Sequence, residues 1–160
     1  MARITWRNSW MGGVVYASGD TFAALLTGEF LYQRLVGMLI LGGTLYALEI
    51  PAYFHYLDRH IQGKSLLSSL KRMLFSALFF NPLWIARHLI FIEFFAGKWQ
   101  AIDIGILLIA THSFVYALPV ALLVNYMIQN KTPLDWRYVA SSAFSAFMAV
   151  YFALSEVLFG

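Results

Sequence analysis

The chain has 160 residues, of which 61% are hydrophobic and 12% are charged, and its mean hydropathy is +0.69. A soluble core of this size cannot bury so much apolar surface, so the composition excludes a soluble globular domain and indicates one integral membrane domain over residues 1–160. The formal net charge of +3 does not indicate nucleic-acid binding, because the basic residues gather in short loops. The lack of cysteine excludes disulfides, thiolate catalysis and cysteine-ligated metals.

Five apolar segments of helical length follow one another along the chain. At 1.5 Å per residue, about 20 apolar residues cross a hydrocarbon core roughly 30 Å thick. The predicted spans are residues 10–26, 34–59, 73–96, 102–128 and 138–159. We therefore predict an all-α fold, a polytopic transmembrane helix bundle of about five spans.

The cations are distributed unevenly between the two ends of these spans. Eight lie in the N-terminal segment, the second loop and the fourth loop, and two lie in the remaining loops. The group of eight is Arg3, Arg7, Arg59, Lys64, Lys71, Arg72, Lys131 and Arg137. The group of two is Arg34 and Lys98. The positive-inside rule then places the N-terminus in the cytoplasm or matrix and the C-terminus on the opposite side.

Small residues and prolines mark particular positions in the spans. Small residues let helices approach closely, and they predict packing faces on three spans. These are Gly12, Gly13, Ala17, Ser18 and Gly19 in the first span, Gly37, Gly42, Gly43 and Ala47 in the second, and Ala140, Ser141, Ala143, Ser145, Ala146 and Ala149 in the fifth. Folding each helical hairpin about its loop brings Pro51, Pro82 and Pro119 to about one depth, together with Glu49. Kinks at a common depth allow a bundle to widen or to hinge, whereas each proline can equally be a tolerated irregularity. We expect proline-kinked third and fourth spans.

Polar and ionisable side chains within the spans are the candidate functional residues. Because a charge at the bilayer centre is costly, such residues face the bundle interior and mark a pathway or a structural pair. The same folding places Arg87 and His88 near the depth of His112. If the partner of Arg87 is Glu49 or Asp20, these groups form a buried polar network that lines an aqueous path or fixes the helix register. Arg34 is expected near Glu93, as an ion pair close to the interface, and Asp20 can alternatively cap a broken helix. The pore or substrate-pathway candidates are Asp20, Glu49, Arg87, His88, His112 and Asn125.

The sequence carries no strong motif for catalysis or for a cofactor. His88 and His112 lie on different spans without a His-Glu-x-x-His motif or an acid at ligand spacing, so no metal or haem is expected. No Ser-His-Asp constellation, glycine-rich phosphate loop or paired-carboxylate motif is present. We therefore expect that the protein is not an enzyme and holds no cofactor.

Several short strings occur in a characteristic order over nearly the whole chain. They are YASGD, QRLVG, YFHYLDRHIQGKS, LPVALLVNY, TPLDWR and VYFALSE. This order resembles the family of the 22-kDa peroxisomal membrane protein and its mitochondrial inner-membrane relatives, with this chain as a prokaryotic-like member. The positions that fall on the family's motifs are Gly19, Asp20, Arg34, Asp58, Arg59, Pro119, Asn125, Tyr126, Pro133 and Arg137.

The chain also departs from that family. The family's Asp-Gln falls on Ser76 and Ala77, and Leu118 stands where the family has a tryptophan before the proline. A second, weaker similarity, in DTFA, RLVG, F-x-x-P and GKW, is to the bacterial L-alanine exporter family, in which the first span follows DTFA instead of preceding it. The first resemblance implies a pore- or channel-like protein of a bacterial inner membrane or of a mitochondrial or peroxisomal-type membrane, with no settled substrate.

Three functions are compatible with these patterns. We predict a channel or pore-like protein that passes a small solute or ion through a cavity lined by buried ionisable residues. The alternatives are a secondary transporter or exporter of a small amino acid or metabolite, and a structural or assembly membrane protein with no transport activity. The expected partners are the lipid bilayer, a small solute or ion, and a second copy of the chain in a homo-oligomer, but not nucleic acid.

Overall fold

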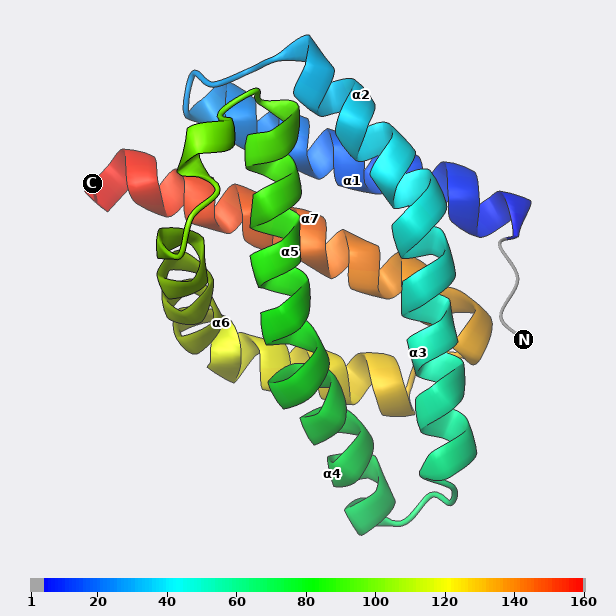
Figure 1. The fold of residues 1–160 in the computed structure, drawn as a ribbon. Helices are drawn as coiled ribbons and strands as arrows, with labels where there is room; N and C mark the ends of the chain where they lie inside the picture. The colour runs from blue at the N-terminus through cyan, green and yellow to red at the C-terminus, as the bar shows by residue number, and fades with distance from the viewer. Residues whose placement is uncertain (1–4, 160) are drawn as a thin grey trace. The chain divides into compact units, whose positions relative to one another are not determined.

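The computed structural model describes residues 5–159, with side chains as far as Tyr151, and 86% of the chain is helical. No strand occurs among these residues, and the predicted all-α class is confirmed. Five continuous helices follow one another (Figure 1), and two of them contain a π-helical segment, η1 or η2. The elements are α1 (Trp6–Leu26), α2 (Tyr32–Leu41), η1 (Gly42–Tyr46), α3 (Ala47–His60), α4 (Leu66–Leu74), η2 (Phe75–Phe80), α5 (Asn81–Phe95), the 3₁₀ turn η3 (Trp99–Ala101), α6 (Gly105–Asn130) and α7 (Leu134–Phe159).

Three of the continuous helices are long and apolar enough to cross a membrane. They are Tyr32–His60 with 29 residues, Leu66–Phe95 with 30 residues and Gly105–Asn130 with 26 residues. These lengths exceed the roughly 20 residues that a hydrocarbon core requires, and they indicate a membrane protein. Membrane crossing by α1 and α7, which the five-span prediction includes, stays a prediction.

The chain divides into two compact units. One consists of Met1–His55 with Pro133–Gly160, and the other of Tyr56–Thr132. The first unit therefore holds α1, α2, η1, all of α7 and α3 as far as His55. The second unit holds the end of α3 together with α4, η2, α5, η3 and α6. A single integral membrane domain stays a prediction.

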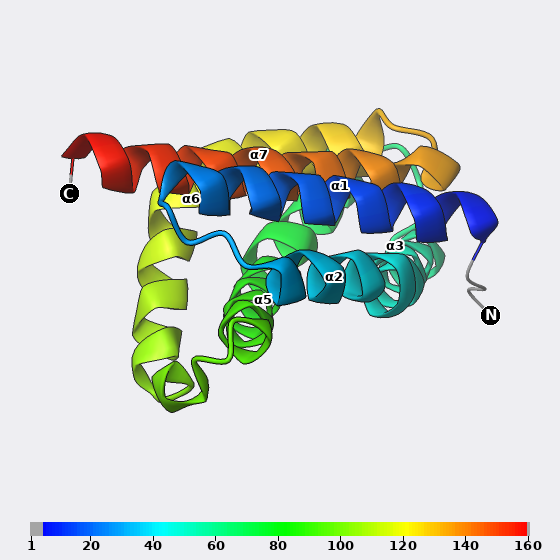
Figure 2. The ribbon, with the colours of Figure 1, turned by 90° about the horizontal axis from the view of Figure 1, so that it is seen from above.

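In the first unit, glycines bring α1 close to its neighbours. A Cβ atom on Gly12 would collide with Tyr138 Oη and lie 2.7 Å from the carbonyl oxygen of Gly42. A Cβ atom on Gly19 would collide with the side chain of Ala146. Figure 2 shows α1 running alongside α7. The predicted packing faces are therefore confirmed at these positions, where only glycine allows the observed approach of the helices.

Hydroxyl groups from two other helices of the same unit bind the π-helical segment η1. A π-helical turn displaces backbone hydrogen bonds and frees carbonyl oxygens for other donors. Ser9 Oγ of α1 donates to the carbonyl oxygen of Gly43 at 2.6 Å, and Tyr138 Oη of α7 donates to that of Gly42 at 2.6 Å. Both bonds satisfy buried carbonyl groups and tie α1 and α7 to the middle of the Tyr32–His60 helix.

In the second unit, Arg72 joins three segments of chain. Its Nη1 donates to the carbonyl oxygens of Ile61 at 2.7 Å and Gly63 at 3.1 Å, both in the turn after α3. Its Nε and Nη2 donate to Asn130 Oδ1, at the end of α6, at 3.0 and 2.9 Å. One buried guanidinium therefore holds the last turn of α4 against the turn after α3 and against the end of α6.

The prolines coincide with irregularities in the helices of the second unit. Pro82 is at the start of α5, directly after η2, and its missing N–H group removes an α-helical bond at this point. Gln129 Nε2 of α6 donates to Ser76 Oγ within η2 at 2.8 Å. Pro119 lies inside α6, which changes direction near its middle (Figure 2). Pro82 therefore coincides with a π-helical segment in the third predicted span and Pro119 with a change of direction in the fourth, while Pro51 lies inside α3 of the first unit. A kink in the third span stays a prediction.

Candidate functional site

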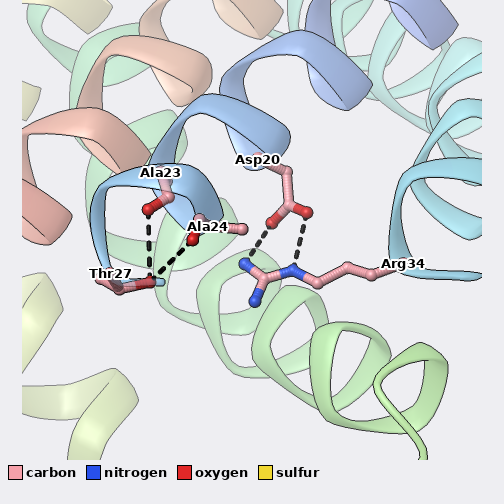
Figure 3. A network of polar contacts seen from close by, with 5 residues as sticks. All are labelled: Asp20, Ala23, Ala24, Thr27 and Arg34. Atoms are coloured by element: carbon pink, nitrogen blue, oxygen red, sulfur yellow. Dashed lines mark hydrogen bonds and ion pairs between the residues drawn. The ribbon is translucent and has the colours of Figure 1, made fainter. Parts of the chain in front are cut away.

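A buried ion pair between α1 and α2 is the central polar feature of the first unit. Arg34 Nε donates to Asp20 Oδ2 at 2.7 Å, and Arg34 Nη2 donates to Asp20 Oδ1 at 2.7 Å (Figure 3). Asp20 is 3% exposed and Arg34 is 9% exposed. The two parallel bonds are the bidentate arrangement that a guanidinium and a carboxylate form best. Each group therefore neutralises the other where water has little access.

The end of α1 positions this pair. Thr27 Oγ1 donates to the carbonyl oxygens of Ala23 at 3.3 Å and Ala24 at 3.2 Å, which occupies acceptors in the last turn (Figure 3). Gly28 then adopts a φ of 73°, a left-handed conformation that glycine reaches without strain and that commonly ends a helix. The chain reverses within a few residues, and α2 begins close enough to α1 for Arg34 to reach Asp20.

The pair also corrects the electrostatics of the α2 terminus. Arg34 is in the first turn of α2, which contains no acidic residue. A cation near a helix N-terminus is unfavourable because the helix dipole is positive there. Asp20 supplies the missing negative charge from the neighbouring helix, so the pair compensates both the buried cation and the dipole.

The position of Asp20 changes two expectations. The sequence predicts Glu93 as the partner of Arg34, but the structure places both bonds of the Arg34 guanidinium on Asp20. Glu93 is half-buried in α5, which belongs to the other unit. Asp20 also lies in the interior of the continuous helix α1, so the alternative that it caps a helix broken at Gly19 is wrong.

The other predicted pathway residues are distributed over both units. Glu49 is half-buried in α3, in the first unit. Arg87 and His88 are half-buried in α5, and the His88 ring stacks on Trp84 with a centroid distance of 4.5 Å. The proposed closeness of Arg87 to Glu49 or Asp20 stays a prediction.

The two remaining candidates on α6 have different environments. His112 is exposed. Asn125 is buried, and its Nδ2 donates to the carbonyl oxygen of Ala121 at 2.8 Å, one turn earlier on the same helix. The Asn125 amide therefore satisfies a backbone acceptor of α6 in this structure.

Several polar residues that tie the helices together were not among the predicted site residues. Ser9 and Tyr138 bind the carbonyl groups of η1, and Arg72 binds Asn130. The adjacent glycines at positions 42 and 43 are the one sequence signal for the first of these contacts, because a glycine pair inside a span allows close helix approach. In the sequence, Arg72 was informative only as one of the loop cations that indicate membrane orientation.

Comparisons with known proteins found no relative of this chain. No protein-family profile, curated protein or solved structure matches the chain. Within the part of the chain that the structure describes, no group of three or more His, Asp or Glu side chains is arranged to hold a metal ion. The Asp20–Arg34 pair therefore stands as the candidate site on its own geometry.

Proposed function

We propose that the protein passes a small solute or ion across a membrane and that the Asp20–Arg34 pair is part of the pathway. The observation that carries this proposal is the bidentate burial of two opposite charges in a membrane chain. Replacing a buried ion pair by apolar residues is often neutral or stabilising, so such a pair is weak support for a purely structural role. Ionisable groups in membrane helices more commonly serve solute or ion movement.

In this proposal, the observed ion pair is the closed state of the pathway. Two bonds of 2.7 Å hold the charges together, and both side chains are almost fully excluded from the surface. The pair belongs to one helical hairpin whose turn contains Gly28. Separation of α2 from α1 at this turn would expose both charges, so the pair acts as a gate that a passing solute or ion opens.

An exporter of a small amino acid is a second candidate, favoured by the chemistry of the same pair. A zwitterion carries an ammonium group and a carboxylate, which are complementary to Asp20 and Arg34 respectively. The solute can therefore replace each residue's partner without stranding a charge. The two residues also belong to the strings DTFA and RLVG, on which the similarity to the L-alanine exporter family rests.

The proposal extends to the family, the membrane orientation and the oligomeric state of the protein. We place it with the family of the 22-kDa peroxisomal membrane protein and its mitochondrial relatives, on the order of the strings in the sequence. The N-terminus faces the cytoplasm or matrix because eight of ten loop cations lie on that side. A homo-oligomer would be needed for a pathway wider than one small helical bundle provides.

Two measurements on reconstituted protein separate the candidates. A channel gives stepwise conductance in a planar bilayer with small ions, whereas an exporter gives saturable exchange of a labelled small neutral amino acid in liposomes. Asp20→Asn should alter either activity, because it removes the charge that holds Arg34. Glu29→Gln is the matched control, since Glu29 is an exposed acid just beyond α1. Conductance and exchange both at the level of protein-free membranes would leave the structural or assembly function.

A further inference from the structure

Arg72 is a buried arginine whose hydrogen-bond partners in the described part of the chain are all uncharged oxygens. Within the described residues, its hydrogen bonds end on the carbonyl oxygens of Ile61 and Gly63 and on the amide oxygen of Asn130. The residue is 8% exposed, and a guanidinium stays protonated in proteins. A buried charge is costly without an opposite charge. These bonds fix the position of the guanidinium but leave its positive charge for an anion to balance.

Three of the four lysines of the chain surround this arginine. Lys71 precedes Arg72 on α4, while Lys64 and Lys131 each directly follow a residue whose oxygen the guanidinium binds. All three lysines are exposed. Three exposed ammonium groups therefore belong to residues next to Arg72 or next to its hydrogen-bond partners, where the last turn of α4, the turn after α3 and the end of α6 meet.

An exposed apolar face begins beside this cationic cluster. Leucines on α4 leave a large part of their side chains uncovered: Leu66 is 70% exposed, Leu67 63%, Leu70 38% and Leu74 41%. Leu67 and Lys71 are four residues apart and thus neighbours on the helix surface. The helix Leu66–Phe95 that starts here is long and apolar enough to cross a membrane. Positive charge therefore meets an apolar surface at the start of a spanning helix.

We propose that Lys64, Lys71, Arg72 and Lys131 bind the headgroup of an anionic phospholipid whose acyl chains lie along the exposed leucines of α4. The phosphate oxygens accept hydrogen bonds from the ammonium groups, and the net negative charge balances Arg72. A zwitterionic phospholipid carries its own cation beside the phosphate, so the cluster discriminates against it. The site is separate from the Asp20–Arg34 pair, which belongs to the other unit, and does not depend on the transport proposal.

Lipid binding to the whole protein tests this site. Native mass spectrometry of protein in a nonionic detergent, titrated with phosphatidylglycerol and in parallel with phosphatidylcholine, measures both affinities. Each lysine removed should weaken phosphatidylglycerol binding by about fivefold. The combined variant Lys64→Gln, Lys71→Gln, Lys131→Gln should therefore lose about 100-fold, with little change for phosphatidylcholine. All three side chains are exposed, and far-UV circular dichroism checks that the variant keeps its helices.

A matched pair of single variants and a soluble competitor complete the test. Lys71→Gln should weaken phosphatidylglycerol binding, whereas Lys98→Gln, an exposed lysine between α5 and η3, should not. Equal losses in these two variants, or parent-like binding by the combined variant, would overturn the proposal. Excess glycerol 3-phosphate should not displace the lipid, because it lacks acyl chains. Displacement would identify a site for free phosphate esters and reject the lipid.

Discussion

Removal of one partner from the Asp20–Arg34 pair should destabilise the protein more than removal of both. The variant Asp20→Leu removes the acceptor of the two hydrogen bonds of 2.7 Å that Arg34 donates. Arg34 is only 9% exposed in the parent fold, so water cannot easily replace that acceptor. Hydrogen bonds to charged groups contribute about 1.5–3 kcal/mol each, and breaking a buried pair from one side costs about 3–5 kcal/mol. We expect a loss in this range for Asp20→Leu and for Arg34→Met.

The double variant Asp20→Leu/Arg34→Met strands no charge, so its stability should fall within about 1 kcal/mol of the parent or above it. Unfolding in mixed micelles with increasing sodium dodecyl sulfate, followed by tryptophan fluorescence, measures all four proteins. Arg59→Met removes an exposed cation and serves as the control, with an expected change within about 0.5 kcal/mol. Losses that simply add in the double variant would show that the two residues do not act as a pair, and the account of the site would be wrong.

Three further predictions concern packing and orientation. Tyr138→Phe leaves the Gly42 carbonyl without its hydroxyl donor and should cost about 1–3 kcal/mol, whereas Tyr116→Phe, at an exposed tyrosine, should cost little in the same unfolding assay. Gly12→Ala puts a Cβ atom against Tyr138 and should cost at least about 1–3 kcal/mol, with the exposed Ser18→Ala of the same helix as control. Reporter tags on the two termini should be found on opposite sides of the membrane. If both tags are found on the same side, at least one of the five predicted spans does not cross the membrane.

The helical fold was largely accessible from the sequence. Long apolar segments dictate helices in a membrane because only helices and closed barrels satisfy every backbone group there. The close contacts of Gly12 and Gly19 followed from the same reasoning, since small residues inside a span have few other uses. Pro82 and Pro119 likewise marked the irregular regions of two helices, because a proline removes a backbone donor wherever it stands.

The partner of Arg34 was not predicted, although a signal for it exists. Folding the chain about the second loop, near residue 65, aligned Arg34 with Glu93. The first turn, around Gly28, places Arg34 within about one helical turn of Asp20 when the hairpin is folded about it. A short hairpin restricts depth more tightly than one that joins two full spans, since an error at the loop midpoint and irregularities in both helices accumulate along its length. The nearer acid was therefore the better choice.

The π-helical segments lay beyond the reach of local patterns. The segment η1 forms where Ser9 and Tyr138, distant in sequence, supply hydroxyl donors to its carbonyl oxygens. Neither residue is special within its own helix. Only the packing of α1 and α7 onto Gly42 and Gly43 gives these hydroxyls their role, so tertiary contacts determined the backbone there.

The most direct test of the transport account is flux through the double variant Asp20→Leu/Arg34→Met, measured beside the parent. Both proteins are reconstituted at equal density in liposomes carrying gradients of a small cation and of a labelled small neutral amino acid. The parent should pass one of them faster than protein-free liposomes, and the double variant should fold as stably but lose that flux, because the charges that recognise the solute or ion are absent. A double variant that conducts like the parent, or a folded parent no faster than protein-free liposomes, would contradict the account.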